Sequence, residues 1–241
     1  MVKNERILYW DQVEATLSYI QNYVYALDHN DRLWIEVAEQ TKGVGQWGRS
    51  FSSPRGGLYC TLMLRWPYSI PLCFVSLLSA LAIADVLPVS CHIKWVNDLY
   101  VRGKKLGGVL VHSIPGSDSK KILCISFGLN INTKKNFLSP FQGISLVDVL
   151  GQSLDIHHLF SKIRSSFDHH IDQMLSKTMK SRLEELYPLL IGWQKPVHVT
   201  TVDMKTVTGV WTGIDAKTGQ VIIDQCQYCW ARSIVPISDA C

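Results

Sequence analysis

Two lysines and a carboxylate lie close together in the segment KWVNDLYVRGKKLGG, residues 94–108. Lys94 falls in a strand-like run, Asp98 belongs to a turn signal, and Lys105 opens the next strand. A hairpin with this spacing predicts that both lysines reach the same region of one sheet. Two ammonium groups can neutralise phosphate and carboxylate charge, while Asp98 can orient or deprotonate an amine. The segment therefore suits chemistry on an acyl phosphate; the alternative is an ordinary hairpin with solvated lysines.

A glycine-rich loop, GVGQWGRS at residues 43–50, precedes that segment. It spells G-x-G-x-x-G and nearly spells a P-loop, with Arg49 in place of the P-loop lysine. Both of those phosphate loops lead straight into a helix, whereas here Pro54 and a strand-like run follow. A kinase loop would need HRD and DFG motifs downstream, and the sequence contains neither. All three familiar interpretations of the loop are therefore excluded.

The surroundings of the loop are rich in positive charge. No Asp or Glu occurs between Glu39 and Asp85. That span contains Lys42, Arg49, Arg55 and Arg65. We expect these cations to be uncompensated and, with the backbone N–H groups that glycines expose, to attract an anion. The alternative is a tight turn with solvated cations.

The apolar pattern indicates the elements that must position these residues. Helices are expected at residues 11–27, at 71–86 and over much of 145–191, with Ser145 as an N-cap and Gly151 as a stop. The expected strands are RLWIEVAEQ, GLYCTLML, CHIKW, LGGVLVHS and KKILCISFGLNIN, with NDLYVRGKK as a turn. After Trp193 come PVHVTT, TVTGVWTGI, GQVIID and YCWARSIVPI. These short strands predict a small appended β-barrel, and hence two domains, 1–193 and 194–241.

The composition is that of a globular protein. It is 47% hydrophobic and 18% charged, and its net charge of +4 makes no strong case for nucleic acid. No apolar stretch reaches the roughly 18 residues of a membrane span, and the N-terminus has no signal-peptide core. Seven cysteines without a framework are typical of reduced thiols in a cytoplasm. The histidine pairs at 157–158 and 169–170 are expected to be solvated.

Three motifs in order resemble the biotin protein ligases, also called holocarboxylase synthetases. They are EQTKGVGQWGRSFSSPRGGLY, KWVNDLYVRGKKLGGVLV and GLNIN. The family pattern is QTxGRGRxGRxWxSPxGxLY, then KWPNDxY with KxxGxL, then GxGxN. Order and approximate spacing agree over about residues 8–235, and the eleven-residue step from Lys94 to Lys105 is kept. One such motif would be a weak signal, whereas three in order are specific.

The resemblance implies an α+β fold. Its catalytic domain, biotin/lipoate ligase-like, would be related to class II aminoacyl-tRNA synthetases and would combine a mixed β-sheet with helices. A small C-terminal SH3-like β-barrel would follow. The chain resembles the short form of the family, without the DNA-binding domain of repressor-type members.

The resemblance also assigns roles to residues. Biotin binding is implied for Thr16, Gln40, Gly43, Val44, Gly45, Gln46, Lys105 and Gly108. ATP binding is implied for Arg49, Phe51, Lys94, Asn97 and Asn132, with Phe51 in place of a tryptophan near adenine. The catalytic residues implied are Lys105, Lys94, Asp98 and Arg49.

The implied reaction has two steps. ATP would adenylate biotin to biotinyl-5′-AMP, and biotin would then pass to one lysine of a biotin carboxyl carrier domain. The acceptor would belong to acetyl-CoA carboxylase or another biotin-dependent carboxylase, and Mg²⁺ would be held through the ATP phosphates rather than by a protein metal site. We expect a cytoplasmic monomer or homodimer, with no nucleic acid or membrane partner.

The chain departs from the family pattern at several positions. Val44 and Gln46 replace two loop arginines, Leu17 replaces an asparagine, and Asn130 replaces a glycine. Each lost charge-assisted hydrogen bond costs roughly 1.5–3 kcal/mol, so weakened binding of biotin or adenylate is expected. Two alternatives stay open: a lipoate or octanoate ligase of the same fold, and a degenerate non-catalytic binding protein.

Overall fold

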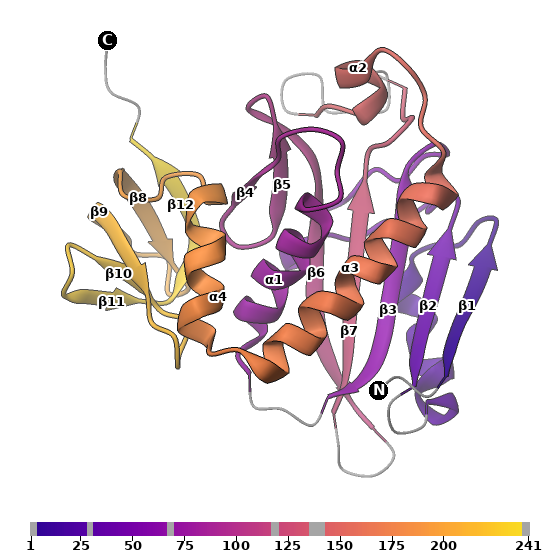
Figure 1. The fold of residues 1–241 in the computed structure, drawn as a ribbon, viewed down its shortest axis with the longest axis horizontal. Coiled ribbons are helices and arrows are strands. Elements are labelled where there is room, and N and C mark those ends of the chain that lie inside the picture. The colour runs from indigo at the N-terminus through magenta and orange to yellow at the C-terminus, as the bar shows by residue number, and fades with distance from the viewer. Residues whose placement is uncertain (1–3, 28–30, 67–69, 117–120, 135–142, 238–241) are drawn as a thin grey trace.

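The computed structural model describes residues 4–27, 31–66, 70–116, 121–134 and 143–237. Two β-sheets and several helices make up the fold (Figure 1). The larger sheet contains β1 (Glu5–Trp10), β2 (Arg32–Val37), β3 (Leu58–Trp66), β4 (His92–Lys94), β5 (Asp98–Val101), β6 (Lys104–Pro115) and β7 (Lys121–Leu129). The helices are α1 (Leu72–Ala84), α2 (Leu146–Leu150), α3 (Ile156–Ser176) and α4 (Met179–Leu186), with 3₁₀ turns at Thr16–Ser18, Ile20–Ala26, Gln46–Gly48 and Tyr187–Leu189.

The larger sheet has the strand order β1-β2-β3-β7-β6-β5-β4. β1 and β2 are parallel, and the other neighbouring strands are antiparallel. Helices α1 and α3 cover one face of this sheet (Figure 1). Alternate residues of β2 enter different cores: Trp34 packs under the helices, whereas Leu33 and Ile35 join a cluster on the opposite face. Because both faces of the sheet are covered, β2 is buried along its whole length, including Arg32 and Glu36.

Several expected elements are confirmed. α1 begins directly after Pro71 and is buried on nearly every side, because its sequence is apolar apart from Ser76 and Ser79, which are buried with it. The Ser145 hydroxyl caps α2 by accepting from the backbone N–H of Asp148, and Gly151 ends it in the left-handed region, with φ 73°. The strands predicted before and after α1 are also present.

The single helix predicted over residues 11–27 is wrong. The segment forms two 3₁₀ turns instead, and the backbone groups of Val13 form hydrogen bonds to residues outside the segment. Val13 N–H donates to the Glu39 carbonyl at 3.2 Å, and Thr41 N–H donates to the Val13 carbonyl at 3.0 Å. These bonds to the entry of the glycine loop replace the bonds that a helix would have made there.

The C-terminal region folds as a second, smaller sheet, at the left of Figure 1. Its strands are β8 (Pro196–Thr201), β9 (Thr206–Ile214), β10 (Val221–Ile223), β11 (Gln227–Cys229) and β12 (Ala231–Pro236), in the order β11-β10-β9-β8-β12. The last predicted strand is two strands, because the chain leaves β11 at one edge and pairs β12 with β8 at the other. Within the described residues no pairing joins the edge strands β11 and β12, so the structure shows a second antiparallel sheet and does not confirm the expected SH3-like β-barrel. No described helix is both long enough and apolar enough to cross a bilayer.

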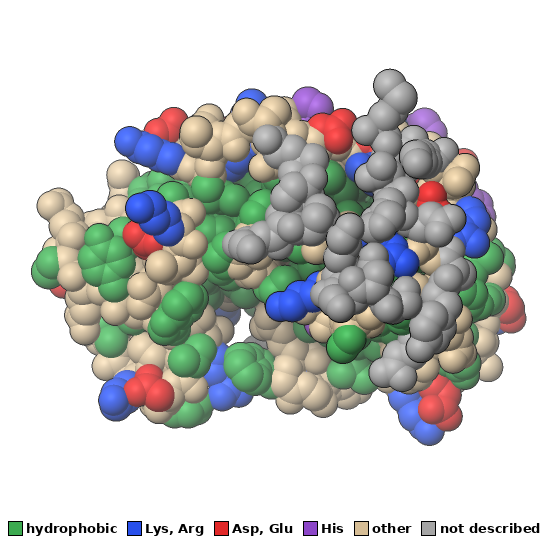
Figure 2. Space-filling view, turned by 90° about the horizontal axis from the view of Figure 1, so that it is seen from below, with side chains coloured by type: hydrophobic (Ala, Val, Ile, Leu, Met, Phe, Trp, Pro, Cys, Tyr) green, Lys and Arg blue, Asp and Glu red, His purple; other side chains and the backbone are tan. Residues whose placement is uncertain are grey.

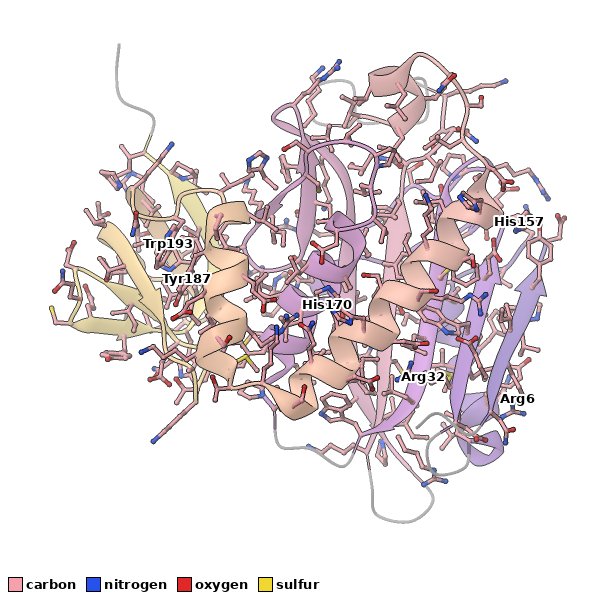
Figure 3. The ribbon with its side chains drawn as sticks, in the orientation of Figure 1. Arg6, Arg32, His157, His170, Tyr187 and Trp193 are labelled. Carbon is pink, nitrogen blue, oxygen red and sulfur yellow. The ribbon has the colours of Figure 1, made fainter. Side chains whose placement is uncertain are left out.

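Aromatic rings join the smaller sheet to the helices. The rings of Tyr187 and Trp193 stack with their centroids 3.8 Å apart, and Trp211 of β9 meets Trp193 edge to face (Figure 3). Buried residues of both sheets form one continuous apolar cluster. The boundary predicted at 193/194 thus falls within a packed junction.

The expectation of solvated histidines is wrong for His170. This side chain is 4% exposed and lies on α3 where it faces α1 and α4 (Figure 3). Its Nε2 is 2.8 Å from the Asp85 carboxylate, and its Nδ1 contacts the Arg182 guanidinium. A polar ring can be buried here because both of its nitrogens have partners.

Candidate active site

The glycine loop folds back on itself before β3. Phe51 N–H donates to the Gly43 carbonyl at 2.8 Å, and Gly45 N–H donates to the Arg49 carbonyl at 2.7 Å. A Cβ on Gly43 would lie 2.3 Å from the Phe51 carbonyl oxygen, so that position admits only glycine. Backbone hydrogen bonds and one obligatory glycine therefore fix the loop.

The two-lysine segment forms the predicted hairpin, with one addition. Asp98 begins a strand of its own, β5, so the chain reverses twice. The first turn, at residues 95–97, joins β4 to β5, and the second, at Arg102 and Gly103 with φ 50° and 72°, joins β5 to β6. In the resulting sheet Asp98 lies opposite Lys94 on β4 and opposite Gly108 on β6. The turn signal at Asn-Asp is confirmed, since Asn97 ends the first turn, but the predicted turn NDLYVRGKK also contains the short strand β5.

Lys105 and Asp98 form an ion pair across β5 and β6. The Lys105 Nζ is 2.6 Å from Asp98 Oδ1, and the two side chains are 34% and 26% exposed. A Cβ on Gly108 would lie 2.8 Å from the same carboxylate oxygen. Asn97 is fixed beside them, since its amide donates to the Val109 carbonyl at 2.6 Å. The sheet thus presents a paired ammonium and carboxylate on a rigid support.

The two segments meet around one cavity of about 170 Å³. Its lining contains Val44, Gly45, Gln46, Arg49, Ser50 and Phe51 from the loop, Asn97, Asp98, Lys105, Gly108, Val109 and Leu110 from the hairpin, and Ser126, Phe127 and Gly128 from β7. The apolar side chains and the aromatic rings suit an apolar ligand body, while the charged groups suit an anionic end. Loop and hairpin are some fifty residues apart in sequence, and only the sheet order brings them together.

Other residues singled out from the sequence lie outside that lining. They are Thr16, Gln40, Gly43, Lys94 and Asn132. Gln40 accepts from Thr16 N–H at 2.9 Å and donates to Ser53 Oγ at 2.9 Å, so it ties the loop to the 3₁₀ turn. Lys94 Nζ sits 5.6 Å from the centre of the Tyr100 ring.

Asn132 is also engaged within the protein. Its amide donates to the Leu154 carbonyl at 2.9 Å and accepts from Leu154 N–H at 3.0 Å. Asn132 therefore holds the segment before α3 against the end of β7.

The expectation of uncompensated cations around the loop is wrong for two of them. Lys42 pairs with Glu14 at 2.8 Å, and Arg55 pairs with Asp11 at 2.6 Å. Both partners come from the N-terminal segment, which the acid-free span does not include. Arg49, in contrast, has no carboxylate partner within the described part of the chain and lines the cavity.

The GLNIN motif begins at Gly128 on β7, but a role is implied only for its Asn132, so the contribution of Gly128 was missed. Gly128 lies opposite Gly108 on β6, and a Cβ on Gly128 would lie 2.5 Å from the Phe51 ring. The glycine lets the ring of Phe51 lie against the strand and form the cavity wall. A lone glycine within an otherwise apolar strand was the available signal, because it marks a close approach.

Burial changes the acidity of two tyrosines near the cavity. It raises the pKa of Tyr100, and the Asp98 carboxylate adds to that effect. It also raises the pKa of Tyr59, whose hydroxyl donates to the Pro54 carbonyl at 2.8 Å and whose ring meets Phe51 edge to face. Both phenols stay protonated at neutral pH, so the site's charged groups are the lysine, the arginine and the aspartate.

A family model described as Biotin/lipoate A/B protein ligase family matches residues 11–132, a span that contains both the loop and the hairpin. The chain belongs to this family. Its relatives place it among the biotin protein ligases. The biotin–[acetyl-CoA-carboxylase] ligase of Paracoccus denitrificans is 31% identical over 199 residues, or 79% of this chain and 73% of that protein. The bifunctional ligase/repressor BirA of Bacillus subtilis is 26% identical over 228 residues, or 88% of this chain.

This ligase spans about two thirds of the BirA protein, 66% of its length. Among solved structures, biotin protein ligase from Aquifex aeolicus, in complex with biotin and ATP, has a TM-score of 0.75. That similarity covers 96% of this chain and 95% of the other at 21% identity. It supports the fold: a large mixed sheet with helices, followed by a second antiparallel sheet.

Proposed function

We propose that this ligase adenylates biotin with ATP and then transfers biotin to a lysine of a carrier domain. The observation that carries the proposal is the cavity where the Lys105–Asp98 pair faces Arg49 of the glycine loop. A cation that is paired but partly exposed can exchange its partner for an incoming anion. The carboxylate released at the same moment becomes available as a base.

In the first step, a carboxylate oxygen of biotin attacks the α-phosphorus of ATP. The bond from that phosphorus to the bridging oxygen breaks, and pyrophosphate leaves. Lys105 and Arg49 would stabilise the negative charge that develops on the α-phosphate, and the ring of Phe51 would stack near the adenine. Thr16, Gln40 and Asn132 are engaged in hydrogen bonds within the protein and would support the loop and the strand ends.

Magnesium would enter with ATP. Asp98 is already paired with Lys105, and no group of three His, Cys, Asp or Glu side chains lies together within the described residues. We therefore propose the ATP phosphates as the principal ligands of Mg²⁺, where the ion would offset phosphate charge.

In the second step, the ε-amine of the acceptor lysine attacks the carbonyl carbon of biotinyl-5′-AMP. The C–N bond forms, the bond from carbonyl carbon to phosphate oxygen breaks, and AMP leaves. Asp98 would accept the proton that the attacking amine loses. The Paracoccus relative is named for acetyl-CoA carboxylase, and we propose an acceptor of that class, a biotin carboxyl carrier domain.

The proposal is tested by ATP–pyrophosphate exchange with biotin, with lipoate and without acid. Exchange that depends on biotin is expected. Exchange with lipoate alone would instead support the lipoate ligase alternative. A protein that binds biotin but gives no exchange would indicate a binding protein that has lost its chemistry.

A further inference from the structure

The first two residues of β12 contact both segments that carry the site. The Trp95 indole N–H donates to the Ala231 carbonyl at 3.0 Å, and Trp95 directly follows Lys94. The Arg232 guanidinium lies over the Trp47 ring, 4.4 Å from its centre. The surface is hollowed between the smaller sheet, on the left, and the rest of the molecule (Figure 2). β12 thus reaches from the hairpin to the tip of the glycine loop.

Trp47 is an unusual residue for its position. Its φ of 60° lies in the left-handed region, which is unfavourable for a bulky side chain, and 61% of its surface is exposed. Neither the local backbone preference nor burial therefore explains how the loop tip keeps this conformation. The ring contact with Arg232 supplies an interaction that comes from a different sheet. A guanidinium over an indole face is attracted by the negative charge of that face.

Arg232 also has contacts within the smaller sheet. Its Nη1 lies 2.9 Å from the Met204 sulfur, and Ala231 pairs with Thr201 of β8. Within the described residues Arg232 has no carboxylate partner. Its planar group is therefore free to stack on the indole while the sheet fixes its position.

Trp47 lies between Gln46 and Arg49, both of which line the cavity. A displacement of the Trp47 ring would therefore displace two residues of the cavity wall. Because Ala231 is bonded to Trp95 in the hairpin segment, the start of β12 defines the spacing between loop and hairpin.

We propose that Arg232 is a positioning residue that holds the glycine loop in place through Trp47. It acts on the loop and does not itself touch the reacting atoms. The kinetic consequence rests on the proposed function, because a loosened loop places Gln46 and Arg49 less well for biotin and ATP. The smaller sheet is thereby part of the adenylation machinery.

The kinetic test is a double-mutant cycle in biotin-dependent ATP–pyrophosphate exchange. An exposed cation–π contact implies that Arg232→Ala raises the KM for biotin about two- to fivefold with little change in kcat. In a Trp47→Ala background the same substitution should have no further effect. Arg232→Lys keeps a cation over the ring and should restore most of the loss. Lys205→Ala is the matched control, since it removes a cation that pairs with Asp203 in the turn between β8 and β9.

A second readout does not depend on activity. Trypsin cleavage after Arg49, followed by mass spectrometry, should be about two- to fivefold faster in Arg232→Ala than in the wild type or in Lys205→Ala. Thermal unfolding of each variant separates a loosened loop from a destabilised fold, and Arg232→Gln serves if the alanine variant does not fold. Equal cleavage rates, or additive effects of the two substitutions on KM, would overturn the proposal. A wild-type protein without exchange would refute the proposed function, while the cleavage rates would still decide the role of Arg232.

Discussion

Replacing Lys105 by methionine removes the ammonium group and keeps most of the apolar stem. In the structure this ammonium contacts the Asp98 carboxylate at 2.6 Å, on side chains that are 34% and 26% exposed. A partly exposed pair of this kind contributes only about 0–1 kcal/mol to folding. For a chain of this length, that corresponds to a fall of roughly 2–4 °C or less in melting temperature.

The expected loss of activity is larger. A hydrogen bond from a charged donor to a ligand contributes roughly 1.5–3 kcal/mol, which is a factor of about 10 to 150 in kcat/KM. We therefore expect Lys105→Met to lose biotin-dependent pyrophosphate exchange by that factor while it remains folded. The assay is exchange at saturating ATP, with thermal unfolding measured on the same preparation.

The partner variant separates the two steps. Asp98→Asn removes the proposed base but leaves the lysine in place, so exchange should stay within about threefold of wild type. Transfer to a carrier domain should fall by about 100-fold or more, the range for loss of a general base. A Lys105→Met protein with wild-type exchange would refute the role given to the lysine. An Asp98→Asn protein that loses both steps equally would refute the division of labour between the two residues.

Further substitutions test the rest of the site and the core. Gly128→Ala places a Cβ 2.5 Å from the Phe51 ring and should raise the KM for ATP about tenfold, measured by exchange at varied ATP. Gln46→Arg restores a cation at the cavity wall and should tighten biotin binding about tenfold in calorimetry, less so at high salt. Burial raises the pKa of Glu36 above its ordinary value of 4.5. Above pH 4.5 the carboxyl therefore ionises more readily in the unfolded state than in the folded state, and the folded state loses stability as the pH rises. Glu36→Gln should therefore raise the melting temperature more at pH 8 than at pH 4.5, by roughly 2–4 °C for each kcal/mol recovered.

Each of these expectations has a result that contradicts it. An unchanged KM for ATP in Gly128→Ala would mean that Phe51 does not contact the nucleotide. Biotin affinity unaffected by Gln46→Arg would place the ligand away from that wall. A Glu36→Gln protein with the same gain in melting temperature at both pH values would show that the Glu36 carboxyl is not the group responsible for this pH dependence.

Much of the larger sheet could be predicted from the sequence because its signals are local. α1 is apolar at all but two positions, the cap at Ser145 and the glycine stop at Gly151 act within one turn, and the strand runs are short and rich in β-branched or aromatic residues. The spacing from Lys94 to Lys105 also placed both residues in one region of sheet, since a hairpin is a local structure.

What the sequence could not provide was the partner of each long-range contact. Arg55 appeared free until the fold brought Asp11 to it, and Gln40 appeared free to bind ligand until it met Thr16. Whether a side chain is paired depends on which distant segment the sheet order places beside it. The residue types in a short stretch of sequence do not indicate which segment that is.

The chemical groups at this site can be read directly from the amino-acid sequence: a glycine loop with an arginine, and two lysines and an aspartate at fixed spacing. The folded structure was needed to show that Lys105 lines the cavity and Lys94 does not, and that Arg232 touches Trp47. Residue types and short spacings are properties of the chain, whereas contacts between β12 and the loop exist only after both sheets have packed. The local conformational preferences of its residues can favour a strand, but tertiary packing determines which strands it pairs with.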